Sequence, residues 1–170
     1  VYHYDAANPS TTKFPEYWDE KAFFAEFSQD YLAVFDVQWP DGAVDHITHF
    51  LPNSALETNG QAITDSPIDI EFGNGNVYVG DASGRNVKIL NATTGQETGR
   101  FNVAAAGVAV DPTDGDIFLA SVTDGRIYHY TKTGGQGVPA VIGSKGSGPG
   151  QFVNPWDIDI VGSTPYVTDA

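Results

Sequence analysis

Residues 67–81 read PIDIEFGNGNVYVGD, and residues 155–169 read PWDIDIVGSTPYVTD. A third stretch, residues 106–121, reads AGVAVDPTDGDIFLAS and has a longer turn. Each copy combines an alternating strand, a turn rich in Gly, Asn or Asp, and a second apolar strand. The chain therefore repeats one antiparallel β-unit at least three times.

A further strand follows two of these units, at residues 86–90 and at residues 126–130. The step from Val87 to Ile127 is 40 residues (127 − 87), which is typical of one four-stranded propeller blade. We predict an all-β fold, a β-propeller of four-stranded antiparallel blades. The 170 residues hold about four blades' worth of sequence, part of a six-bladed or otherwise larger propeller.

The composition fits short strands and narrows the set of partners. Nineteen Gly and ten Pro favour turns over long helices, and no apolar run reaches the roughly 18 residues of a membrane span. The net charge of −14 disfavours nucleic acid, because an acidic surface repels phosphates. Such a surface favours solubility in a salty or extracellular setting, and cation binding is the alternative reading.

Residues 14–60 diverge from the repeats. Residues 22–27 and 31–37 could be mistaken for helix, but the second run alternates and an Asp-Gly turn follows it, so we predict strands. Residues 53–64 read as a polar loop between blades, and residues 132–151 as a crossover rich in Gly, Ser and Pro.

Residues 1–5, VYHYD, match residues 127–131, IYHYT, in a third strand. The chain thus starts where one blade's third strand starts and stops where another blade's second strand ends. Either it is an excerpt of a longer propeller, or its N-terminal strand completes the last blade, within one chain or between copies. Open strand edges need such a partner, so self-association is one expected interaction.

Two family resemblances follow from motifs. Residues 144–160, SKGSGPGQFVNPWDIDI, continuing to YVTD at residues 166–169, resemble an NHL repeat. Residues 14–27, FPEYWDEKAFFAEF, together with FLP at residues 50–52 and SPIDIEFG at residues 66–73, resemble the glucose/sorbosone dehydrogenase-like propellers. We therefore interpret residues 1–170 as one propeller domain, partial in extent. Its dehydrogenase-like region covers residues 1–64 and its NHL-like blades residues 65–170.

The second resemblance implies pyrroloquinoline quinone (PQQ), a calcium ion, a catalytic histidine and a sugar substrate. No position here matches that family's quinone-binding motifs. A tricarboxylate quinone needs several cations, and the chain has three arginines and five lysines. Arg85 and Arg126 sit just before third strands, a usual place for loop-end residues with no ligand.

Carboxylates supply the candidate metal ligands. Asp111, Asp114 and Asp116 lie around a turn glycine and could hold calcium, although a capped hairpin turn explains them as well and is the reading we favour. Asp69 and Asp157 share one register on innermost strands, where side chains point at the central channel. They could bind calcium or cap backbone amides of the next blade.

Histidines and one asparagine complete the candidates. His46 and His49 are three apart, which on a regular strand places them on opposite faces, so they cannot share a metal. His3 and His129 occupy equivalent strand positions, where a packing role or a general base is open. Asn91 begins the sequon Asn-Ala-Thr and is a glycosylation candidate if the protein is secreted by a glycosylating cell.

These observations favour a binding module that is secreted, on the cell surface or periplasmic. We expect it to bind a protein, a glycan or a neighbouring subunit through loop ends or the channel face, with Ca²⁺ as a candidate structural ion. The alternative is a fragment of a PQQ-dependent sugar dehydrogenase, which the second resemblance alone suggests. Catalytic and quinone-binding residues stay unassigned.

Overall fold

The computed structural model describes nine stretches of the chain. They are residues 6–7, 16, 19–28, 31–38, 40–49, 57–58, 61–62, 64–132 and 137–170. Within these stretches the secondary structure is strands and turns, with no α-helix, and nothing there forms a helix able to cross a membrane. The N-terminal strand predicted at residues 1–5 and the FLP element at residues 50–52 lie outside the described residues.

Two sheets are complete four-stranded antiparallel blades whose strands follow chain order. The first complete blade consists of β6 (Pro67–Gly73), β7 (Asn76–Asp81), β8 (Asn86–Asn91) and β9 (Glu97–Phe101). The second complete blade consists of β10 (Gly107–Val110), β11 (Ile117–Ser121), β12 (Arg126–Tyr130) and β13 (Ala140–Ile142). The two correspond to the 40-residue recurrence and confirm it.

Shorter sheets flank these two blades. An N-terminal sheet contains β1 (Lys21–Glu26), β2 (Tyr31–Gln38) and β3 (Ala43–His49), and a C-terminal hairpin contains β16 (Pro155–Val161) and β17 (Thr164–Asp169). Two small pairs are β4 (Glu57–Thr58) with β5 (Gln61–Ala62) and β14 (Ser144–Lys145) with β15 (Gln151–Phe152). The predicted all-β fold is confirmed, as are the strands expected near residues 22–27 and 31–37.

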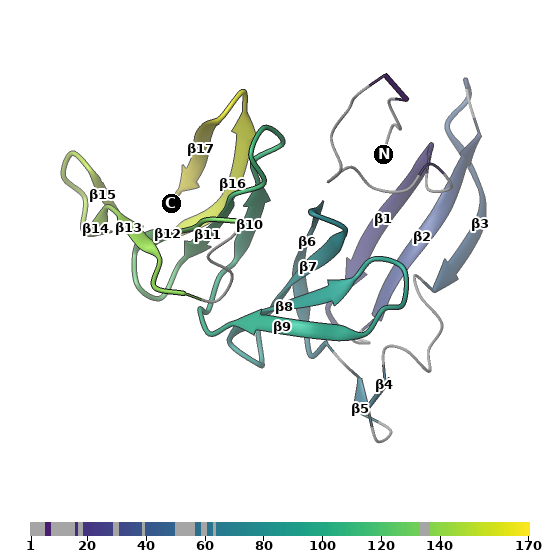
Figure 1. Cartoon of the computed structure of the whole chain (residues 1–170), viewed down its shortest axis with the longest axis horizontal. Helices are drawn as coiled ribbons and strands as arrows, with labels where there is room; N and C mark the ends of the chain where they lie inside the picture. Colours follow the sequence, from purple (N-terminus) through teal and green to yellow (C-terminus); the bar gives the residue numbers. More distant parts are fainter. Residues whose placement is uncertain are drawn as a thin grey trace.

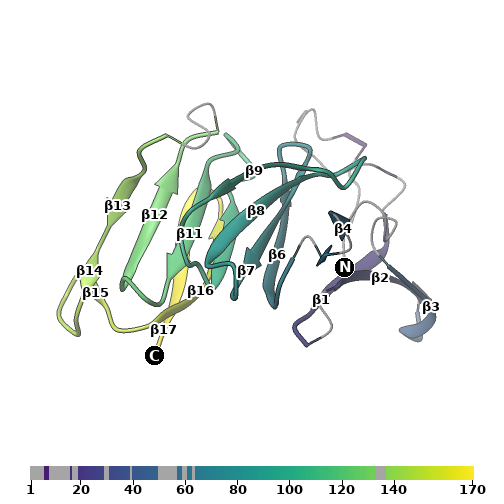
Figure 2. The ribbon, with the colours of Figure 1, turned by 90° about the horizontal axis from the view of Figure 1, so that it is seen from below.

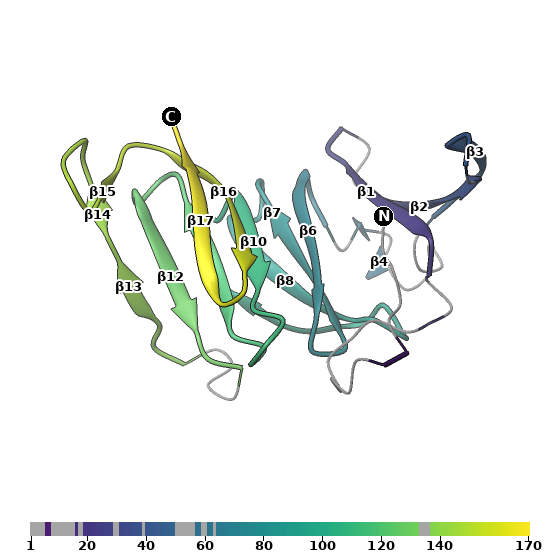
Figure 3. The same cartoon turned by 90° about the horizontal axis from the view of Figure 1, so that it is seen from above.

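The sheets pack side by side, each rotated relative to the one before it (Figures 1 and 2). Their first strands β1, β6, β10 and β16 are successive neighbours, as Figure 3 shows for β6, β10 and β16. This is the radial arrangement of a β-propeller, in which each blade leans on the next.

The apolar core lies between the sheets. One cluster joins β2 to the first complete blade through Leu32, Val34, Val77 and Val79. A second joins the two complete blades, and its members are Tyr78, Val87, Phe101, Val103, Ala105, Val108, Val110, Ile117, Leu119 and Tyr130. A third joins the second complete blade to the C-terminal hairpin around Ile158. Burial on both faces explains why β10 and β11 are apolar at almost every position.

Candidate functional site

Four carboxylates lie on the innermost strands, and we call them the acidic row: Asp69 and Glu71 on β6, Asp157 and Asp159 on β16. Residues two apart on a strand share one face, so each pair points the same way. On β10, between these strands, the register places Gly107 opposite Ala120, as Asp69 is opposite Gly80 and Asp157 opposite Thr168. β10 therefore lies between the two carboxylate pairs and has small residues at the positions that carry carboxylates in β6 and β16.

Asp69 caps the neighbouring blade. Its Oδ2 accepts a hydrogen bond from the Val108 amide at 2.6 Å, and its Oδ1 accepts one from the Ile70 amide at 2.8 Å. Glu71 accepts one from the Val110 amide in the same way. Asp157 accepts the Ile158 amide of its own strand at 2.9 Å. Asp69 thus caps a backbone amide of the next blade, which is one of the two roles left open for it.

The acidic row is a site of perturbed ionisation. Burial raises the pKa of Asp69 to about 6 against the opposing effect of its two amide donors, with a smaller contribution from Asp157. Burial also raises the pKa of Glu71 to about 8, and the negative charges of Asp69 and Asp159 push it in the same direction. Glu71 is therefore largely protonated at neutral pH.

The side chain of each of the three turn aspartates accepts hydrogen bonds. Asp111 Oδ1 accepts the Thr113 amide at 2.7 Å and the Ser163 hydroxyl at 3.3 Å. Although burial alone would raise the pKa of Asp111, these hydrogen bonds hold it below its usual value. Asp114 accepts the Asp116 amide at 2.9 Å, a turn-capping bond of the kind the sequence favoured.

Asp116 faces away from this turn and bonds His129. Its Oδ2 lies 2.7 Å from His129 Nε2, and the imidazole stacks on Phe118 with ring centroids 4.4 Å apart. In the part of the chain that the structure describes, no three His, Cys, Asp or Glu side chains gather around one point as metal ligands would. Calcium binding at Asp69, Asp157, Asp111, Asp114 or Asp116 stays a prediction.

Asn91 ends β8 and is half-buried. Its Oδ1 accepts the amides of Thr93 and Thr94, both at 2.9 Å, which fixes the β8–β9 turn. Glycosylation there stays a prediction, and a glycan on Nδ2 would leave the Oδ1 bonds possible.

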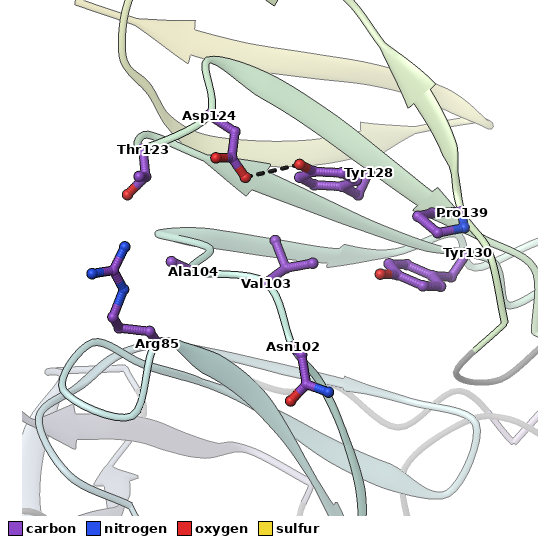
Figure 4. A pocket seen from close by; sticks show the side chains of 9 residues that line it. All are labelled: Arg85, Asn102, Val103, Ala104, Thr123, Asp124, Tyr128, Tyr130 and Pro139. Carbon is purple, nitrogen blue, oxygen red and sulfur yellow. Dashed lines mark hydrogen bonds between the residues drawn. The ribbon is translucent and has the colours of Figure 1, made fainter.

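A groove opens between the two complete blades, at the end that carries the β7–β8, β9–β10 and β11–β12 loops (Figure 4). Its volume is about 410 Å³. We call it the Arg85 groove, and its lining residues are Arg85, Asn102, Val103, Ala104, Thr123, Asp124, Tyr128, Tyr130 and Pro139. This volume lies within the range of small-ligand sites.

Arg85 has an unusual backbone. Its φ is +53°, a left-handed conformation that costs a non-glycine residue about 1 kcal/mol. The register places Gly125 at the corresponding position of the β11–β12 turn, where φ is +60°. At Gly125 a Cβ would come within 2.8 Å of the Lys145 Cα, so that turn is packed by the next loop, whereas the space beside Arg85 is the groove.

The wall of the groove that faces Arg85 carries side-chain oxygen atoms held by hydrogen bonds. Asp124 Oδ2 accepts hydrogen bonds from the Tyr128 hydroxyl at 2.8 Å and the Ser121 hydroxyl at 3.2 Å. Burial, and next the bond to Asp124, raise the pKa of Tyr128. Figure 4 shows Arg85 extending toward the loop that carries Thr123 and Asp124.

The sequence singled out Arg85 only as a loop-end cation. One sequence signal could have marked Arg85 as a binding residue. It lies one residue before the third strand of its repeat, where the neighbouring repeat has a glycine. The rest of the groove could not be read from motifs, because its walls come from different blades. It offers one arginine and no lysine, too few cations for a tricarboxylate quinone.

The fold is shared with solved propellers. No family model and no curated protein matches the chain. A streptogramin B lyase structure is similar to it with a TM-score of 0.58 and 14% identity over 88% of this chain and 44% of that one. A chain in a crystal structure of a nidogen/laminin complex gives 0.59 and 19% identity over 88% of this chain and 51% of that one.

At these identities the likeness establishes the fold, and the chain spans about half the length of the two structures. The class of protein is therefore a β-propeller module, in agreement with its blades and its inter-blade cores.

Proposed function

We propose that this chain is a binding module of an extracytoplasmic β-propeller, secreted, on the cell surface or periplasmic, and that it holds a glycan or protein partner in the Arg85 groove. The observation that carries the proposal is the groove itself. Loops of two adjacent blades bring a cation and a carboxylate, and strand β12 brings two tyrosines, to the rim and floor of one cavity. Binding residues are commonly carried on loops that a rigid scaffold positions.

Two further facts support a binding role. The net charge of −14 keeps such a module soluble in salty surroundings and repels non-specific anionic partners. One similar propeller was solved as part of a nidogen/laminin complex, so this fold serves protein binding in that case. The groove has space for one or two sugar units or a few peptide side chains.

The test is to probe the whole chain on glycan and protein arrays at about 0.15 M salt. We expect at least one partner whose binding is lost in Thr123→Trp, which places an indole at the exposed rim of the groove. Thr94→Trp is the matched control, because Thr94 is exposed in the β8–β9 turn of the first complete blade and does not line the groove. No partner on either array, or partners indifferent to Thr123→Trp, would overturn the proposal.

A further inference from the structure

Arg85 offers an uncommitted guanidinium to the groove. Within the described ranges it has no hydrogen-bond or ion-pair partner, whereas Arg100, on the outer strand β9, pairs with Glu97. A guanidinium presents a planar fork of N–H donors that matches a carboxylate in two parallel hydrogen bonds. The first requirement on the ligand is thus one planar oxyanion.

The backbone conformation of Arg85 is a second observation that favours a ligand-binding role for its side chain. The corresponding residue in the next blade is a glycine with nearly the same φ, so the turn itself does not need an arginine. A non-glycine residue held in the left-handed region at the edge of a cavity is the kind of strain found at ligand sites.

The facing wall sets the second requirement. Asp124 presents oxygen lone pairs, while the Tyr128 hydroxyl donates its proton to Asp124 and is also approached by the Arg126 guanidinium. Such a wall accepts hydrogen bonds from hydroxyl groups and repels a second negative charge. A ligand with one carboxylate and neighbouring hydroxyls fits both walls, whereas a phosphate monoester brings a second negative charge that Asp124 opposes.

The floor sets the third requirement. Val103 and Pro139 are apolar, and Tyr130 is buried with its ring 4.4 Å from that of Phe101. A rigid floor of this type packs against the C–H face of a sugar ring and does not select for further polar groups.

We propose that the Arg85 groove binds a uronate, that is, a sugar unit whose carboxylate pairs with Arg85, whose hydroxyls donate to Asp124 and Tyr128, and whose C–H face lies over Val103 and Tyr130. This inference rests on the proposed function, since it names the ligand class of that same groove.

The first experiment is calorimetric titration of the whole chain with galacturonate, glucuronate and short oligogalacturonates. Galactose, the galacturonate methyl ester, acetate and inorganic sulfate serve as comparison ligands. We expect the uronates to bind at least tenfold more tightly than the neutral sugars and the simple anions. Equal affinity for neutral sugars removes the carboxylate from the inference, and equal affinity for sulfate or acetate reduces the site to simple anion binding. Tighter binding of a peptide through its terminal carboxylate also overturns the sugar assignment.

Variants separate binding from folding. Arg85→Gly restores the residue type of the equivalent turn, so we expect an equal or higher melting temperature together with at least a tenfold loss of uronate affinity. Arg85→Lys keeps the charge without the planar fork, so its uronate affinity should lie between those of the wild type and Arg85→Gly. Arg100→Gln removes the same charge from the outer strand and should bind as the wild type does. Unchanged uronate binding in Arg85→Gly overturns the inference.

The outcomes also distinguish this inference from the proposed function. If no uronate binds but another array partner is lost in Thr123→Trp, the groove is a binding site for a different class of ligand. If neither occurs, both proposals fail.

Discussion

Lys88 is a buried cation on β8, with 9% of its surface exposed, and its ammonium lies 2.7 Å from an Asp81 carboxylate that is almost fully buried. Asp81 also accepts the Gly84 amide at 2.6 Å. We predict that Lys88→Met lowers the free energy of unfolding by about 3 kcal/mol, because it leaves a buried carboxylate without its counter-charge. Urea denaturation measures the loss, and Lys88→Met combined with Asp81→Asn should recover part of it. A loss below about 1 kcal/mol would show that the pair contributes little.

Glu71 makes the stability of the protein depend on pH. The folded protein holds the Glu71 proton up to about pH 8, whereas the unfolded chain releases it near its ordinary pKa of 4.5. Between these values the folded state binds more protons, so the free energy of unfolding falls as the pH rises. We predict that Glu71→Gln removes most of this fall and is more stable than the wild type at pH 9 by more than about 1 kcal/mol. Parallel pH profiles of the two proteins would contradict this.

The acidic row shows which residues the sequence could assign. The shared register of Asp69 and Asp157 was visible in the repeats. The depth of Glu71 was not, because its burial depends on the neighbouring strand β10. On its other side, β10 approaches β16 closely because it carries Gly107, where a Cβ would lie 2.8 Å from the Asp157 Cα.

At the scale of elements, glycines on the first strands set how closely the blades pack. A Cβ on Gly73 of β6 would lie 2.6 Å from Val110 Cγ1 on β10. We predict that Gly73→Ala destabilises the protein by about 1–3 kcal/mol through this overlap. The obstacle is a side chain that Val110→Ala shortens. The double variant Gly73→Ala, Val110→Ala should therefore lose less stability than the two single variants lose together. Thermal unfolding of all four proteins gives the coupling, and strict additivity would mean that the blades shift apart freely.

The elements that the sequence located poorly are the fourth strands. β9 reads ETGRF with two of its five positions exposed, and β13 lies within the stretch of residues 132–151 that we interpreted as a crossover. An outer strand pairs on one side and buries little, so its apolar pattern is weak. The polar loop expected at residues 53–64 contains the short pair β4 and β5.

At the scale of the molecule, the recurrence of one unit predicted the propeller because each blade needs its neighbour to cover an apolar face. The Arg85 groove belongs to no single unit. It forms where the turn of one blade faces the turn and third strand of the next, and no motif in either repeat records their separation. The structure was therefore needed to bring Arg85 and Asp124 to one cavity.

The charge of the whole molecule leads to a last prediction. A chain with 22 acidic and 8 basic residues repels itself when folded, and salt screens that repulsion over about 10 Å at 0.1 M. We predict that raising NaCl from about 0.01 M to about 0.5 M increases the melting temperature by about 2–4 °C, since relief of about 1 kcal/mol moves a protein of this size by that much. Glu16→Lys with Asp65→Lys, both at exposed positions, changes the net charge from −14 to −10 (−14 + 4) and should flatten the salt dependence. Sucrose is the uncharged control, and an equal salt response in the two proteins would mean that screening is not the cause.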